Sequence, residues 1–387
     1  MYGLKVKPVK RKRFLRFRSV GLSVVWLLFP LVNVAKELPP YKSAILMEAE
    51  TGSVLFEYNS YLPRSPASTI KLLLMLVVME EIEDLKVNLD EPVTVSQEAS
   101  RIGGSQVYLK EGEVFRLGEL MEAIAISSAN DACVAVAEYI SGTAEEFVEL
   151  MNQRSKRLGL FNSVCVNVHG LDDTPLDNGN VTTAYDLAVV SKNLLYHSKV
   201  IEWAVQRERP FRRGQFRLFN TNKLLGQYRG LNGLKTGYTN RAGFCLVGTA
   251  ERKDMSLISV VLGAPDEETR YIETRKLLDH GFQNFVKMRI LRSGQNAGIV
   301  ELREGSQSHV QALVQDEYIA VLRKGDDSRM RRQLEYRENI VAPVRKGEVI
   351  GSLSVYIGER SVFKTDLVAA EEVSRLRWWD RLKLWLP

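Results

Sequence analysis

The chain has 387 residues, 45% hydrophobic and 26% charged, so it is long enough for roughly two or three domains with buried cores. Its 27 glycines and 12 prolines exclude a collagen-like or low-complexity protein. The formal charge of +6 depends on eight Lys and Arg residues before residue 19 and becomes −2 without them, which argues against a nucleic-acid-binding protein.

The N-terminal segment, residues 1–35, has the layout of an export signal. Behind the basic stretch lie 17 uncharged residues, 19–35, followed by the polar Lys36. This run is short for a spanning helix and contains Pro30 and Asn33, so cleavage after Ala35 and retention as an anchor both stay open. In either case the rest of the chain is expected outside the cytoplasm, at the outer face of the membrane or in the periplasm.

The first exported domain is predicted over residues 41–283. It begins with a β-hairpin, Ser43–Glu48 and Val54–Tyr58, and continues with a helix over Ser68–Ile82 that is apolar on all sides and should be buried. Further elements follow in chain order: helices around 117–126, 131–140, 143–158 and 183–196, strands around 216–219, 233–236, 243–250 and 255–262, and a last helix near 270–285. Because strands enclose a run of helices, we predict an α+β fold with an antiparallel sheet flanked by helices.

A small all-β domain is predicted over residues 287–368, where short alternating segments are separated by Gly and charged turns. The remaining residues, 369–387, suggest an amphipathic helix that binds a membrane surface. Its apolar side chains share one third of a helical wheel: Trp378, Trp379, Leu382, Trp385 and Leu386. A helix that docks on its own protein is the alternative.

The cysteines and histidines suggest neither a metal site nor a disulfide framework, and no cofactor is expected. Only three cysteines and four histidines occur, without the spacing of metal ligands. Cys133 and Cys245 are interpreted as small buried hydrophobes. His169 and Asp172 are interpreted as loop residues, because no nucleophile elbow accompanies them.

Ser68 and Lys71 are the first candidate reactive pair, at the start of the buried helix. Residues three apart share a helix face, so the hydroxyl and the amine can meet. Burial and the positive end of the helix dipole both favour a neutral lysine that can accept the serine proton. The same spacing occurs in Ser361–Lys364, but that segment alternates like a strand, where residues three apart face opposite sides.

Two further motifs lie downstream. Ser128 and Asn130 fall in a break between two helices, where ordinary capping residues are also common. Lys235, Thr236 and Gly237 lie in a strand; Gly there often marks a close backbone approach, and the simpler role for Lys235 is a solvated edge lysine.

The order and gaps of these motifs resemble those of the penicillin-recognising active-serine enzymes. Over about residues 41–387 the chain is most similar to the D-alanyl-D-alanine carboxypeptidases, the low-molecular-mass penicillin-binding proteins. The similar segments are 66–68, 167–172, 220–225 and 233–239, together with the β domain and the tryptophan-rich tail. Thr69 and Ile70 depart from the family pattern of a larger apolar residue followed by threonine, which affects packing but neither reacting group.

The resemblance implies acyl transfer between Ser68 and the amide that joins two D-alanines of a peptidoglycan stem peptide. It implies Lys71 as the base, Ser128 as a proton relay and Asn130 as a substrate-binding catalytic group. It also implies β-lactam antibiotics as covalent ligands. Its substrate-binding residues would be Lys235 and Thr236 at the terminal carboxylate, Gly237 next to them, and Tyr238, whose backbone N–H would form the oxyanion hole with that of Ser68. Arg270 matches a family position near the carboxylate site, and an arginine on the surface of a helix is the equal alternative for it.

Three alternatives remain at this point. A peptidoglycan endopeptidase would use the same residues. A class A serine β-lactamase would carry a Glu-x-x-Leu-Asn motif about 35 residues beyond Ser128, yet residues 160–167 contain no glutamate. A non-catalytic scaffold would not need both lysines and both serines.

Overall fold

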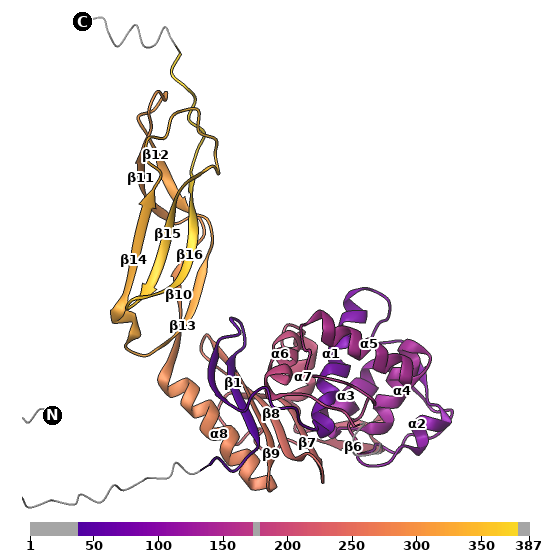
Figure 1. Cartoon of the computed structure of the whole chain (residues 1–387). Coiled ribbons are helices and arrows are strands. Elements are labelled where there is room, and N and C mark those ends of the chain that lie inside the picture. The colour runs from indigo at the N-terminus through magenta and orange to yellow at the C-terminus, as the bar shows by residue number, and fades with distance from the viewer. Residues whose placement is uncertain (1–37, 173–178, 378–387) are drawn as a thin grey trace, which may run out of the picture. The chain divides into compact units, whose positions relative to one another are not determined.

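The computed structural model describes residues 38–172 and 179–377, and Figure 1 shows how its elements are arranged. The expected leader, residues 1–35, and the five apolar side chains of the expected tail helix lie outside the described residues. Within residues 38–172 and 179–377, no helix has the length and apolar character needed to cross a membrane.

A five-stranded antiparallel sheet lies at the centre of the first domain, in the order β2-β1-β9-β8-β7. Its strands are β1 (Ser43–Glu48), β2 (Val54–Tyr58), β7 (Leu231–Thr239), β8 (Gly243–Arg252) and β9 (Met255–Ala264). The sheet therefore combines the N-terminal hairpin with strands that follow the helices, which confirms the predicted α+β class. β7 is an edge strand, so one side of its backbone is open to a partner.

Side chains alternate between the two faces of this sheet and build a core on each. On β9, Ile258 and Val260 pack in the larger core with the helices, whereas Leu257 and Val261 pack in a second core with α8 (Glu267–Asn284). This period of two is what a strand buried on both faces requires. In Figure 1, α8 covers one face of the sheet and the other helices lie on the opposite side.

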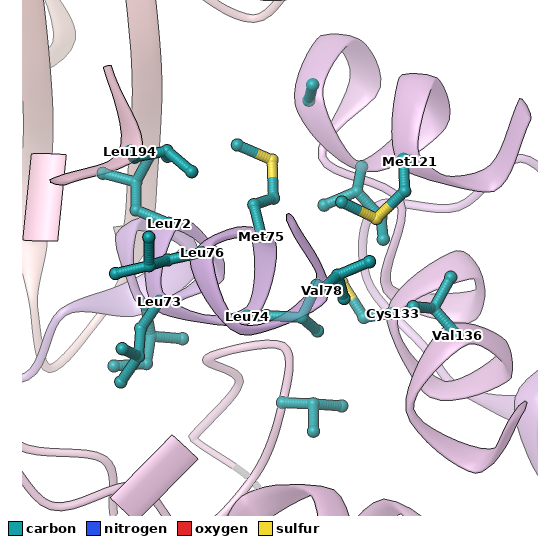
Figure 2. Close-up of a cluster of buried hydrophobic side chains, with 14 of the residues drawn as sticks. Leu72, Leu73, Leu74, Met75, Leu76, Val78, Met121, Cys133, Val136 and Leu194 are labelled. Carbon is teal, nitrogen blue, oxygen red and sulfur yellow. The ribbon is translucent and has the colours of Figure 1, made fainter. Parts of the chain in front are cut away.

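The helical side is organised around α1 (Lys71–Glu83), whose residues Lys71 to Met79 are all buried. Figure 2 shows side chains of α1 packing against Met121, Cys133, Val136 and Leu194 from three other helices. The surrounding helices are α2 (Gln97–Arg101), α3 (Leu117–Ser127), α4 (Asn130–Ser141), α5 (Ala144–Arg157), α6 (Ala184–Leu194) and α7 (Ser198–Ala204). The expectation of a buried helix at this position is confirmed.

Two short hairpins accompany these helices. They pair β3 (Pro92–Thr94) with β4 (Val114–Arg116), and β5 (Glu208–Phe211) with β6 (Phe216–Phe219). The sequence analysis identified only β6 among these four strands. Strands of three or four residues carry too few alternating positions to show a period of two.

The C-terminal region is all-β, as predicted. It pairs β10 (Phe285–Leu291) with β13 (Tyr318–Arg323) and forms a five-stranded sheet in the order β11-β12-β16-β15-β14. The strands of that sheet are β11 (Asn296–Glu301), β12 (His309–Val314), β14 (Met330–Tyr336), β15 (Val349–Ile357) and β16 (Arg360–Ala369). A hydrophobic cluster of its own, from Ile290 to Val373, supports our proposal that this region is a separate domain.

The expected tail helix does not begin at residue 369. Ala369 ends β16, Val373 is buried and forms a β-bridge with Val344, and Arg375 forms one with Gly305. Residues 370–377 thus form no helix, and they are tied to the β domain by Val373, which belongs to its hydrophobic cluster. A helix in residues 378–387 stays a prediction.

Candidate active site

Ser68 lies in a 3₁₀ turn, Ala67–Ile70, that leads directly into α1. The predicted helix over 68–82 was therefore wrong in its first turn. In a 3₁₀ turn, side chains three residues apart lie almost directly above one another, and the Lys71 Nζ is 3.0 Å from the Ser68 Oγ. Ser68 is partly exposed while Lys71 is fully buried. The serine hydroxyl is therefore accessible from solvent, and the lysine amine contacts it from the protein interior.

The Lys71 amine contacts the second motif as well. Its Nζ lies 3.1 Å from the Ser128 Oγ, 2.7 Å from the Ser128 carbonyl oxygen and 2.5 Å from the Asn130 Oδ1. Burial lowers the pKa of Lys71 from 10.5 to about 8, and the nearby Cys133 and Asp131 oppose this effect. A lysine with this pKa can accept and release a proton near neutral pH. Its amine contacts the hydroxyl groups of both Ser68 and Ser128.

The break between α3 and α4 fixes Ser128 and Asn130. Ser128 adopts a left-handed backbone conformation with φ of 61° at the end of α3, which turns its hydroxyl towards Lys71. The Asn130 amide donates to the Gly103 carbonyl oxygen at 2.7 Å, and its backbone N–H donates to that of Ser105 at 2.7 Å. Asn130 is thus held in place by the 103–105 loop and is not a helix cap.

A buried carboxylate anchors the same loop from below. Asp131 is almost fully buried and accepts hydrogen bonds from the backbone N–H groups of Val107 and Leu109, both at 3.0 Å. Burial raises the pKa of Asp131, and the backbone hydrogen bonds oppose that rise. The sequence analysis did not single out Asp131, because an aspartate in a first helical turn has the usual signature of a cap.

The third motif lies on the edge strand β7. Lys235 is almost fully buried and donates to the Thr236 carbonyl oxygen at 3.1 Å, so it is not a solvated edge lysine. Burial, reinforced by the charge of Lys71, lowers the pKa of Lys235 well below its ordinary value. An anion in the groove would favour its protonated form. The Thr236 hydroxyl donates to the Thr221 Oγ1 at 2.7 Å.

Two glycines allow backbone to approach the nucleophile closely. A Cβ on Gly237 would lie 3.1 Å from the Ser68 nitrogen, and one on Gly170 would lie 2.1 Å from the Ala67 carbonyl oxygen. Gly170 also has φ of +88°, which side chains disfavour. The expectation that Gly237 marks a close approach is confirmed: β7 passes directly beside the turn that carries Ser68.

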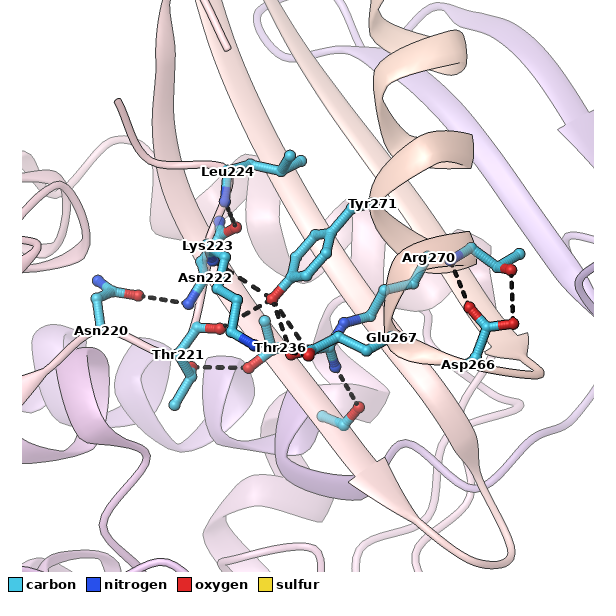
Figure 3. A network of polar contacts seen from close by, with 12 residues as sticks. Asn220, Thr221, Asn222, Lys223, Leu224, Thr236, Asp266, Glu267, Arg270 and Tyr271 are labelled. Carbon is cyan, nitrogen blue, oxygen red and sulfur yellow. Dashed lines mark hydrogen bonds and ion pairs between the residues drawn. The ribbon is translucent and has the colours of Figure 1, made fainter. Parts of the chain in front are cut away.

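Arg270 lies in the first turn of α8 and faces the end of the groove. Its guanidinium donates to the Gly237 carbonyl oxygen at 3.3 Å, to the Glu267 Oε1 at 2.9 Å and to the Tyr271 hydroxyl at 3.0 Å. Figure 3 shows this network, in which Glu267 also pairs with Lys223 at 2.7 Å. Sequence reasoning did not identify Glu267 or Lys223 individually, although Lys223 belongs to the segment 220–225 that carries part of the resemblance.

A groove of about 570 Å³ connects these groups. It exposes side chains or backbone from all three motifs, namely Ser68, Ser128, Thr236, Gly237 and Tyr238, and it is also lined by Ser105, Thr221, Lys223, Phe244, Glu267 and Arg270. Lys71, Asn130 and Lys235 lie buried beneath it. The structure thus places every site residue that the sequence suggested either in the lining of this groove or among the buried side chains beneath it.

The histidine and cysteine side chains that could also react are buried and take no part in the groove. The Nδ1 of His169 accepts a hydrogen bond from the Leu171 backbone at 3.2 Å, and burial lowers the pKa of His169 to about 4. The three thiols, Cys133, Cys165 and Cys245, are buried, and burial raises their pKa to about 11, 12 and 11 respectively. Within residues 38–172 and 179–377, no cluster of His, Cys, Asp and Glu has the arrangement of a metal site.

Comparison with solved structures identifies the class of fold. The chain is similar to penicillin-binding protein 5 from Haemophilus influenzae, with a TM-score of 0.76 and 28% identity over 88% of this chain and all of that one. It is also similar to penicillin-binding protein D2 from Listeria monocytogenes, solved in its ampicillin-bound form, with a TM-score of 0.58 and 31% identity over 64% of this chain and 98% of that one. The fold is that of the penicillin-binding, transpeptidase-like proteins.

The family follows from the sequence comparisons. Residues 36–266 match the D-alanyl-D-alanine carboxypeptidase family and residues 285–375 match the C-terminal domain of penicillin-binding protein 5. The chain is 36% identical to the D-alanyl-D-alanine carboxypeptidase DacF of Bacillus subtilis over 346 residues, which cover 88% of each protein. This chain belongs to the D-alanyl-D-alanine carboxypeptidase family.

Proposed function

We propose that this protein is a serine-type D-Ala-D-Ala carboxypeptidase that removes the terminal D-alanine from peptidoglycan stem peptides. The observation that carries the proposal is the position of the Lys71 amine, 3.0 Å from the Ser68 Oγ and 3.1 Å from the Ser128 Oγ. One buried base thus contacts the groove-facing nucleophile and the hydroxyl that would deliver the proton to the leaving group.

In the first half of the reaction, the Ser68 Oγ attacks the carbonyl carbon of the penultimate D-alanine while neutral Lys71 accepts the hydroxyl proton. The oxyanion would be held by the backbone N–H groups of Ser68 and Tyr238, each donor contributing about 3 kcal/mol. The close approach of Gly237 to the Ser68 nitrogen supports this pairing. The proton then passes from Lys71 through Ser128 to the leaving amine, and the C–N bond breaks.

In the second half, water attacks the acyl-enzyme ester and Ser68 is released with its proton restored. Thr236 and Lys235 would bind the terminal carboxylate of the substrate before cleavage, and Asn130 would hold the substrate amide. Arg270 would act at the end of the same groove, with its charge partly offset by Glu267.

We further propose that β-lactam antibiotics acylate Ser68 and remain attached for a long time. Among the described residues that line the groove, Glu267 is the one carboxylate, and it is held by Arg270 and Lys223. It is therefore committed to ion pairs and is not presented as a base that activates water beside the ester. Slow loss of the adduct distinguishes this function from that of a β-lactamase.

The cellular location is also a proposal. The basic and apolar leader supports export, and the tryptophan-rich segment 378–387 supports peripheral attachment to the outer face of the membrane.

The activity is tested by incubating the protein with a pentapeptide that ends in two D-alanines and measuring free D-alanine. The proposal predicts one D-alanine per peptide cleaved, and no release above background with Ser68→Ala. Release that is unaffected by Ser68→Ala would refute the role of Ser68.

A further inference from the structure

A second hollow of about 310 Å³ continues the groove beyond Tyr238. Tyr238 and Phe244 line both cavities, and their rings lie 4.3 Å apart. The second hollow also contains Lys42, Arg64 and Arg241. We call these three residues the basic subsite.

The cations of the basic subsite have no acidic partner among the described residues. Lys42, Arg64 and Arg241 form no ion pair with any residue in the described ranges, and no carboxylate lines the hollow. The Arg64 Nε is buried and donates no hydrogen bond to the described chain. Asp266 directly follows Pro265, which lines the hollow. Its carboxylate instead accepts hydrogen bonds from the Thr269 backbone N–H and hydroxyl, at 2.7 and 2.9 Å.

The basic subsite is built on fixed backbone. The backbone N–H of Arg64 donates to the Thr182 carbonyl oxygen at 2.7 Å, and the backbone N–H of Lys42 donates to the Leu262 carbonyl oxygen at 3.0 Å. Arg241 lies in the short turn between β7 and β8. Three chain segments distant in sequence therefore converge on one positively charged hollow, which is suited to an anion.

The direction of β7 relates this hollow to the substrate. An extended peptide can add to the open edge of β7 as an antiparallel strand. If its C-terminal carboxylate lies at Thr236, its earlier residues run past Gly237 and Tyr238 towards Arg241, about 3.4 Å per residue. The residue that precedes the two D-alanines then lies closest to the basic subsite, and a long side chain from it can reach the three cations.

We propose that the basic subsite binds a side-chain carboxylate on the residue that precedes the two D-alanines. The substrate class is a stem peptide whose third residue is a diamino dicarboxylic acid, such as diaminopimelate, in preference to lysine. This inference rests on the proposed function for the placement of the peptide. The side chain of that third residue would thus bind at a different place from the network of Arg270 and Glu267.

The test uses two pentapeptides that differ only in the third residue, diaminopimelate or lysine, both ending in two D-alanines. Dissociation constants are measured calorimetrically on full-length Ser68→Ala, which retains the groove but cannot be acylated. The proposal predicts that the diaminopimelate peptide binds about tenfold more tightly, as for a charge-assisted hydrogen bond in a half-buried site.

When Arg241→Gln is combined with Ser68→Ala, the diaminopimelate peptide should bind at least about threefold more weakly, and the dissociation constant of the lysine peptide should stay unchanged. Lys42→Gln, at an exposed side chain, is the second variant in case Arg241→Gln impairs folding. Arg157→Gln, an exposed cation on α5, is the matched control and should change neither constant.

Equal binding of the two peptides, or equal weakening of both by Arg241→Gln, would overturn the basic subsite. Its failure is separable from failure of the proposed function, which is judged by D-alanine release from the same peptides by the unmodified protein. A binding preference without hydrolysis supports the subsite alone, and hydrolysis of both peptides without a preference supports the function alone.

Discussion

The pH dependence of acylation tests the role of Lys71 as the base. Burial lowers the pKa of Lys71 from 10.5 to about 8. At pH 7 this leaves roughly one tenth of the lysine neutral, against roughly three molecules in ten thousand at the ordinary value. The structure therefore supplies about 300-fold more of the reactive form at neutral pH.

The assay is the second-order rate constant for acylation by a chromogenic penicillin, measured from about pH 6 to pH 10. Because the neutral amine is the active form, the rate should rise about tenfold per pH unit at low pH and level off above about pH 8. Lys71→Arg keeps a cation but does not release its proton, so it should lose at least about 100-fold in rate.

Three results would contradict a base role for Lys71 with a lowered pKa. A rate that is independent of pH would show that Lys71 does not lose a proton before the attack. A rise that continues to pH 10 would show an ordinary lysine pKa. Near-normal acylation by Lys71→Arg would show that another group is the base.

Three further predictions concern the groove and the tail. Gly237→Ala should lower kcat/KM about 100-fold, because its Cβ would press on the Ser68 turn; near-normal kcat/KM would contradict this. Glu267→Gln removes a carboxylate whose pKa is held below its usual value by its cationic neighbours, and should lower KM for anionic substrates about threefold; an unchanged or higher KM would count against it. Deletion of 378–387, which spares the buried Val373, should release leader-cleaved protein from membranes in a flotation assay, and undiminished retention would assign attachment to another segment.

The sequence predicted the main architecture because long apolar patterns report burial directly. The helix that follows Ser68 was identified from its continuous apolar run, and the strands β1 and β2 match the predicted hairpin. The first turn of that helix was not predictable locally, because the positive φ of Ala67 and the close approach of Gly170 depend on contacts far along the chain.

The sequence predicted which residues form the motifs, but it did not predict their burial or their ion pairs. The contacts of Lys71 with Ser128 and Asn130 span 57 and 59 residues, so only their order suggested that they meet. Burial of Lys235 could not be read from its strand position, where an edge lysine is usually solvated. The ion pair between Glu267 and Lys223 spans 44 residues and leaves no local pattern.

The proposed reaction requires Ser68 to be the nucleophile that forms the acyl-enzyme. It is tested most directly by incubating the protein with labelled penicillin, digesting it and locating the label by mass spectrometry. We expect a long-lived adduct on the peptide that contains Ser68, absent in Ser68→Ala and slow to form in Lys71→Arg. A label on another residue, or persistent labelling of Ser68→Ala, would show that Ser68 is not the nucleophile.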